Sequence, residues 1–196
     1  MLALSAMLWA LVACAAREGD RDQVNDERSV TETPEANGRN LPALGQPLMI
    51  ALAQARNHHH KADVYLKEAN LAQAIAAVRA IEEVPFPEGA AEAEDVKLDA
   101  RARLAKLLVT SGQLDEAMTV VDTGIARATR DSFFVANLHT VKGEVYEARA
   151  NVLDDDPSED AKVRARQARM QAIESFDRSI AINTELQKAL MNESKP

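Results

Sequence analysis

The 196-residue chain is poor in the residues that usually carry catalytic chemistry. It contains one cysteine, one tryptophan and an aromatic content of only 4%. A single cysteine allows no disulfide within the chain, so a folded domain must be held together by its apolar core. The sequence also lacks a glycine-rich phosphate loop and a serine flanked by glycines as in a nucleophile elbow. We therefore expect the protein not to be an enzyme and to use no small-molecule cofactor.

The chain also has no excess of positive charge. The chain has 31 acidic and 23 basic residues, which gives a formal net charge of −8. Proteins that bind nucleic acid rely on clustered lysine and arginine to neutralise phosphates, so we expect no nucleic-acid partner. The only tryptophan, Trp9, lies close to the N-terminus, so the rest of the chain has none for stacking on sugar rings.

A long apolar run occurs only at the N-terminus, from Met1 to Ala16. A helix that spans a bilayer needs about 20 apolar residues, and Arg17 and Glu18 end this run too early. A secretory signal, with an apolar region of roughly 7 to 15 residues that ends at small side chains, fits better.

The end of this run, Leu11-Val12-Ala13-Cys14, resembles the export signal of bacterial lipoproteins. The resemblance implies that residues 1–13 are a signal peptide and that Cys14 is acylated and anchors the protein to a membrane of the bacterial cell envelope. Ala15 after the cysteine favours the outer membrane, facing the periplasm. An unlipidated secretory signal is the alternative. No lysine or arginine precedes Cys14, so we expect the true start codon to lie upstream.

Residues 14–46 are predicted to be a disordered tether. The segment is rich in charged residues, contains Pro34, Gly38 and Pro42, and has few large apolar side chains. Such a composition cannot bury enough surface to offset the entropy of ordering the chain.

From Pro47 onward the sequence predicts helices, because apolar residues recur at helical spacing and no alternation of period two is present. Two segments match each other in their apolar positions, and a third follows the same spacing. The matching sets are Leu71, Ala74, Ile75, Val78 and Ile81; Leu114, Ala117, Met118, Val121 and Ile125; and Ala172, Ile173, Phe176 and Ile180.

A small residue followed three positions later by a large one precedes each set. These pairs are Ala62 with Tyr65, Ala105 with Leu108, and Gly143 with Tyr146. The interval from Ala62 to Ala74 is 12 residues, and so is the interval from Ala105 to Ala117.

Together these segments resemble tetratricopeptide repeats, and Gly112 stands where that family usually has a turn glycine. The resemblance implies an all-α fold, a short right-handed α-solenoid of about three helical hairpins with a concave face.

The predicted repeat domain covers residues 47–196, with units at about 55–88, 98–131 and 136–186. The third unit carries an insertion at 150–166, so both of its helices are expected to be extended. Within the insertion, Asp156, Pro157 and Glu159 predict a helix N-cap, a first-turn proline and a capping box. Pro47 suits the first turn of the opening helix, and residues 185–190 are expected to close the stack.

By analogy with the family, the first helix of each unit presents the residues that bind a protein or peptide. They would be Arg56, His59, Asp63, Lys67, Asp99, Lys106, Asn137, Thr140 and Glu144. This predicts a membrane-anchored adaptor or scaffold whose partner is another envelope protein or peptide. Two alternatives stay open: a lipoprotein that binds a solute or peptidoglycan, although few aromatic residues are present to line a pocket, and a purely structural spacer.

Two clusters of potential metal ligands are present in the sequence. In His58-His59-His60 the side chains point about 100° apart on a helix and cannot share one ion, so we expect no metal there. The acidic segment 154–160 lacks the ligand spacing and central glycine of a calcium loop and is expected to be a solvated helix-capping loop. The basic residues that follow are expected to balance it as a solvated face, with a docking strip as the alternative; they are Lys162, Arg164, Arg166 and Arg169.

Overall fold

The computed structural model describes residues 45–193, and every element among them is a helix or a turn. The predicted signal peptide 1–13, the lipidation site Cys14 and nearly all of the tether 14–46 lie outside the described residues. The first helix begins at Gln46, at the end of the predicted tether, with Pro47 in its first turn as predicted. The all-α prediction is confirmed for the described residues.

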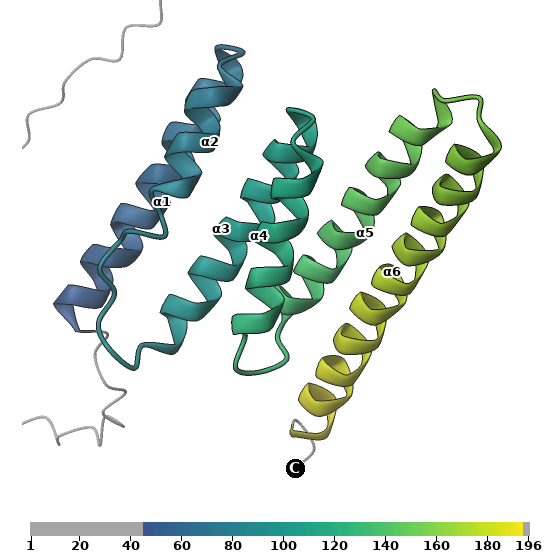
Figure 1. The fold of residues 1–196 in the computed structure, drawn as a ribbon. Coiled ribbons are helices and arrows are strands. Elements are labelled where there is room, and N and C mark those ends of the chain that lie inside the picture. The colour runs from purple at the N-terminus through teal and green to yellow at the C-terminus, as the bar shows by residue number, and fades with distance from the viewer. Residues whose placement is uncertain (1–44, 194–196) are drawn as a thin grey trace, which may run out of the picture. The chain divides into compact units, whose positions relative to one another are not determined.

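Six helices follow one another along residues 45–193 (Figure 1). Their bounds are α1 (Gln46–Lys67), α2 (Leu71–Arg79), α3 (Ala91–Thr110), α4 (Leu114–Arg127), α5 (Phe133–Asp154) and α6 (Glu159–Glu193). The segment between α2 and α3 contains Pro85, Pro87 and Gly89, which disfavour a helix, and it is not helical. No helix of this part of the chain combines the length and the apolar character needed to cross a membrane.

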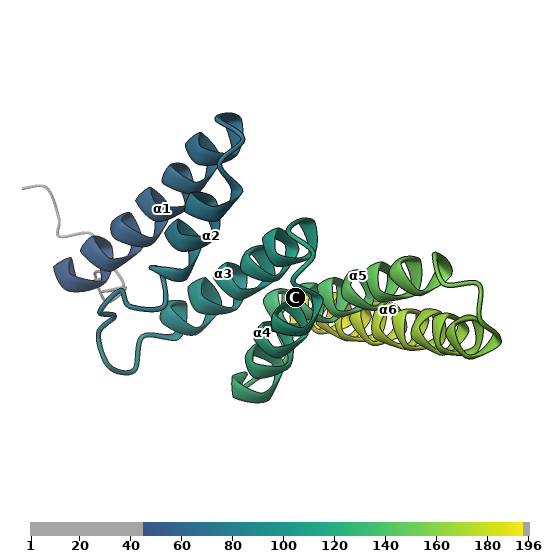
Figure 2. The same cartoon turned by 45° about the horizontal axis from the view of Figure 1, so that its top comes forward.

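Each helix packs against the next one in the sequence. Short turns join α1 to α2, α3 to α4 and α5 to α6, and these pairs form three hairpins (Figure 2). Between hairpins, α2 packs on α3 and α4 packs on α5, while α3 and α5 also contact each other directly. One main apolar core runs through these contacts and includes the fully buried Val78, Leu98, Leu108, Leu138 and Ile182.

The turns of the first two hairpins have the same geometry. The amide of Asn70 donates to the carbonyl of Tyr65 at 2.8 Å, and the amide of Gln113 donates to the carbonyl of Leu108 at 2.9 Å. The residue before each of these amides has a positive φ, 55° at Ala69 and 77° at Gly112. This left-handed conformation is the usual end of a helix and favours glycine.

Small residues set the distances between helices. Ala62, Ala105 and Gly143, the small residues of the three repeated pairs, are all buried. At Gly143 the aromatic ring of Phe176 on α6 lies so close that an added Cβ would stand 2.7 Å from its Cζ. No side chain other than hydrogen fits there without movement, so α5 and α6 approach closely because position 143 is glycine.

The insertion predicted in the third unit is absorbed by longer helices. α5 extends to Asp154 and α6 spans 35 residues, with only a short turn between them. Residues 185–190 belong to the last part of this same helix α6.

The predicted N-cap of this last helix is wrong. The hydroxyl of Ser158, and not the carboxylate of Asp156, accepts the amide of Ala161, at 3.2 Å. Asp156 instead accepts the amide of Ser158 at 2.9 Å and stabilises the turn before the helix. Pro157 therefore precedes the cap and does not occupy the first helical turn.

The predicted apolar stripe of α6 is also wrong in part. Ala172 is buried, but Ile173 and Ile180 are exposed. The face that packs on α5 is made mainly of small residues: Ala161, Ala165, Ala168, Ala172, Ser175 and Ser179, with Ile182 near the end. Because the helices are in close contact at Gly143, small side chains fill most of the interface, and the ring of Phe176 packs into the space that Gly143 leaves.

Candidate functional site

An open groove lies between α1, α3 and the first turn of α5. Its volume is about 430 Å³. Side chains from α1 and α3 form most of it, with one aromatic residue from α5. The lining residues are Leu52, Ala55, Arg56, His59, Glu92, Asp95, Val96, Asp99 and Phe134.

The groove combines apolar and acidic side chains. Ala55 is buried, and Leu52, Val96 and Phe134 are half-buried. The charged lining residues are three acids, Glu92, Asp95 and Asp99, and one base, Arg56. Asp95 is already bound, since both of its carboxylate oxygens accept hydrogen bonds of 2.8 Å from Arg130.

His59 connects the groove to a polar network between α1 and α3. Its Nδ1 lies 3.1 Å from Nη1 of Arg103, whose other terminal nitrogen donates to Asp63. A guanidinium can only donate, so Nδ1 must accept and the proton of the neutral ring belongs on Nε2. Nε2 lies 3.6 Å from a carboxylate oxygen of Asp99, which is too long for a direct hydrogen bond.

Folding favours the neutral form of the His59 ring. Burial lowers the pKa of His59 from its ordinary value of 6.5, because the charged form loses solvation, and Arg103 lowers it further. Asp99 and Asp63 act in the opposite direction without reversing the shift. The lowered pKa therefore disfavours an ion pair between His59 and Asp99.

Three of the residues predicted to bind a partner line this groove: Arg56, His59 and Asp99. Asp63 lies beside them but is held by Arg103. The groove is thus formed where the predicted faces of α1 and α3 meet.

The other predicted residues lie elsewhere. Lys106 and Glu144 form an ion pair of 3.1 Å that joins α3 to α5. Thr140 shares a hydrogen bond of 2.9 Å with Ser179 on α6 and so faces the partner helix of its own hairpin. Asn137 is half-buried, and Lys67 is exposed at the end of α1; neither lines the groove.

Glu92, Asp95, Val96 and Phe134 line the groove but were not predicted from the sequence. The predicted second unit begins at about residue 98, whereas α3 begins at Ala91. The spacing of Asp95 and Asp99, four residues apart, places both on one helix face and could have extended the predicted site by one turn. No comparable signal existed for Phe134, because α5 contributes it through tertiary packing.

The three consecutive histidines point in different directions, as expected from helix geometry. His58 lines a second groove, between α1 and the segment after α2, together with Lys61, Glu83 and Pro85. His59 faces the groove between α1 and α3, and His60 is exposed. Among residues 45–193 no group of three or more histidine, cysteine or acidic side chains could hold a metal ion.

Comparison with known proteins finds no relative of this chain. No family model, curated protein or solved structure matches the chain. The resemblance to tetratricopeptide repeats thus stays a prediction based on its own residues. So does the lipoprotein signal, because Cys14 lies outside the described residues.

Proposed function

We propose that this protein is an adaptor of the bacterial cell envelope that holds a segment of another polypeptide in the groove between α1, α3 and α5. A lipid on Cys14 would anchor it to a membrane, with the outer membrane as the expected location. No catalytic role is part of this proposal.

The composition of the groove is the observation that carries the proposal. An apolar floor beside a charged rim suits a peptide that inserts one apolar side chain and presents polar groups around it. Three acidic residues and one arginine line the groove. One of the acids, Asp95, forms an ion pair with Arg130. Glu92 and Asp99 are left to face the occupant, so the favoured peptide carries a basic residue next to its apolar one.

Repetition of the helix pairs supports a solenoid like that of tetratricopeptide repeats. The turns after α1 and α3 have the same hydrogen bonds and the same positive φ at equivalent positions. The contacts of α3 with α5, and of each second helix with the next first helix, are those expected of stacked hairpins. In such a stack the first helices share one surface, and the groove lies on it.

Photo-crosslinking in the native envelope tests the proposal. A photoreactive residue at position 56, exposed beside the groove, is compared with one at position 60, exposed on α1 and outside the groove lining. We expect position 56 to capture a polypeptide and position 60 not to. Capture of glycan or of a small solute at position 56 would favour the solute-binding alternative, and no capture would favour the structural spacer.

Charge reversal then tests the acidic rim. Asp99→Lys should reduce capture by about tenfold, because a basic peptide would meet a like charge. Asp155→Lys, the same change on the exposed turn between α5 and α6, is the matched control and should leave capture unchanged. Equal loss in both variants would show that overall charge, and not the groove, governs binding.

A further inference from the structure

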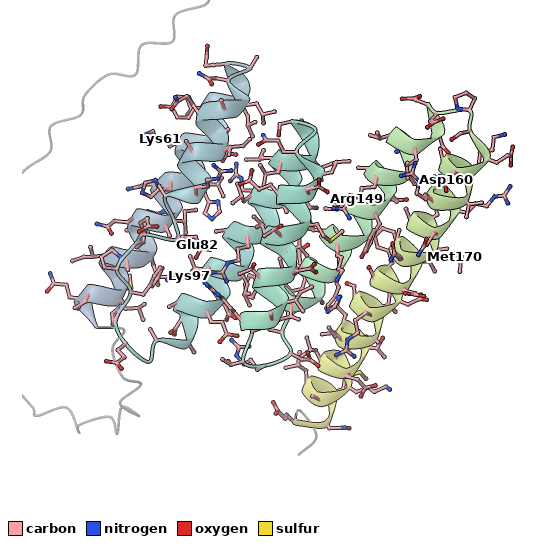
Figure 3. All side chains as sticks on the ribbon, viewed as in Figure 1. Lys61, Glu82, Lys97, Arg149, Asp160 and Met170 are labelled. Atoms are coloured by element: carbon pink, nitrogen blue, oxygen red, sulfur yellow. The ribbon has the colours of Figure 1, made fainter. Side chains whose placement is uncertain are left out.

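The outer face of α6 carries a stripe of large apolar side chains that no other helix of residues 45–193 covers. Val163, Met170, Ile173 and Ile180 are between 50% and 63% exposed. Met170 lies on the side of α6 turned away from α5 (Figure 3). Exposed apolar residues that share one face of a helix often mark a surface that contacts a partner.

Two charged residues complete the stripe. Arg166 and Asp177 fill the gaps, so the row 163, 166, 170, 173, 177, 180 advances in steps of three and four residues. This is the heptad spacing of a helix that pairs with another helix.

Arg166 stands out from the basic residues around it. Lys162, Arg164 and Arg169 form ion pairs with Glu159, Asp160 and Asp154, as expected for a solvated face that balances the acidic segment. Within the described part of the chain, neither Arg166 nor Asp177 has such a partner. The two residues are 11 positions apart on one helix, so they cannot reach each other.

The stripe is complementary to itself when two copies run antiparallel. In that arrangement, residues whose numbers add up to a constant lie at the same level. The sum 343 places Val163 opposite Ile180, Arg166 opposite Asp177, and Met170 opposite Ile173. Every apolar residue then meets an apolar one, and each unpaired charge meets its opposite.

We propose that α6 pairs with α6 of a second copy of this chain in an antiparallel, two-fold symmetric dimer centred between Met170 and Ile173. A two-fold interface requires one surface to be complementary to itself, which this register provides. It also closes on itself and leaves no unpaired stripe for further copies. None of the residues that line the groove between α1, α3 and α5 lies on α6, so the dimer does not depend on the proposed adaptor function.

Variants with exchanged charges at positions 166 and 177 test this pairing. Their dimerisation is measured by sedimentation equilibrium of the full chain, at low salt and under reducing conditions. Arg166→Asp places two aspartates opposite each other, and Asp177→Arg places two arginines opposite each other. Each single variant should weaken dimerisation by about tenfold or more. The double variant R166D/D177R restores opposite charges across the two-fold axis and should dimerise within about threefold of the unchanged protein.

Arg164→Asp is the matched control, because it makes the same charge change on α6 outside the stripe. Its ion pair with Asp160 is exposed, so we expect dimerisation to stay unchanged. Met170→Glu and Ile173→Glu, which place carboxylates in the apolar centre, should give monomers with unchanged circular dichroism.

Three results would overturn the proposal. The first is a chain that stays monomeric up to about 1 mM. The second is association that does not respond to the charges at positions 166 and 177, including association through any other segment. The third is open-ended assembly, which would indicate contact between α6 and a different surface of the next copy.

Discussion

The surroundings of His59 in the folded protein change its pKa. This residue lies between Asp63 on α1, Asp99 on α3 and the guanidinium of Arg103, and burial lowers its pKa. His139 on α5 is in a similar position, since burial and the charges of Arg178 and Lys142 lower its pKa. Both histidines thus bind a proton less readily in the folded protein than in the unfolded chain.

Stability should therefore fall as the pH decreases. A histidine whose pKa is lowered by folding contributes full stability above its unfolded pKa of about 6.5. That contribution is lost as the pH falls from there toward the folded pKa, because the unfolded chain takes up the proton first. We expect urea unfolding to give a lower free energy at pH 5.5 than at pH 7.5, and His59→Gln to make this decrease smaller. If the His59→Gln variant keeps the whole decrease, the pKa of His59 is not lowered by folding.

Gly143 controls the distance between α5 and α6. On an open helix surface, Gly→Ala stabilises by about 1 kcal/mol. At position 143 the new methyl group would collide with the ring of Phe176, so we expect Gly143→Ala to destabilise by roughly 1–3 kcal/mol. The double variant G143A/F176L should recover part of this loss in urea unfolding. A stabilising effect of Gly143→Ala alone would show that the helices can separate at no cost.

The first two hairpins have the same turn conformation but different residues at the position with positive φ. Ala69 adopts a φ of 55°, where Gly112 adopts 77° in the second hairpin. A side chain in this region costs about 1–2 kcal/mol, and glycine avoids the cost.

Substitutions at these two turn positions should change the stability of the protein in opposite directions. Ala69→Gly should stabilise the protein by up to about 1 kcal/mol and Gly112→Ala should destabilise it by about the same amount. Ala76→Gly, at an exposed position within α2, is the control and should destabilise by about 1 kcal/mol. Thermal unfolding of the three variants separates the turn effect from the general cost of glycine. If Ala69→Gly is as destabilising as the control, the shared turn geometry is wrong.

The third hairpin differs from the others because its helices extend beyond the main core. The contacts at its far end are a small cluster of Ala150, Ala165 and Ala168 with Leu153. Alanines bury little apolar area, so this end of the hairpin gains little stability from packing.

In the folded domain as a whole, stability should therefore be uneven. Hydrogen exchange followed by mass spectrometry should show faster exchange of amides in segments 150–154 and 159–168 than in 98–108, where Leu98, Leu104 and Leu108 lie in the main core. Equal protection of both regions would indicate that the α5–α6 extension unfolds only with the whole domain.

Much of the local structure could be predicted from the sequence. Helical spacing of apolar residues, Pro47 in the first turn of α1, the turn at Gly112 and the break at Pro85 and Pro87 act over a few neighbouring residues. Their effects depend on backbone sterics and on hydrogen bonds within one turn. Such features are determined by neighbouring residues and form without contacts to another helix.

Tertiary packing decided what local patterns could not. Ile173 and Ile180 fit a buried stripe by their spacing, yet the close approach of α6 to α5 at Gly143 buries the small residues and leaves these two exposed. The groove likewise exists because α1, α3 and α5 bring distant side chains together, among them Phe134, which no local pattern marked. A helix sequence determines which faces are apolar, but only the neighbouring helices determine which of those faces is covered and which is left for a partner.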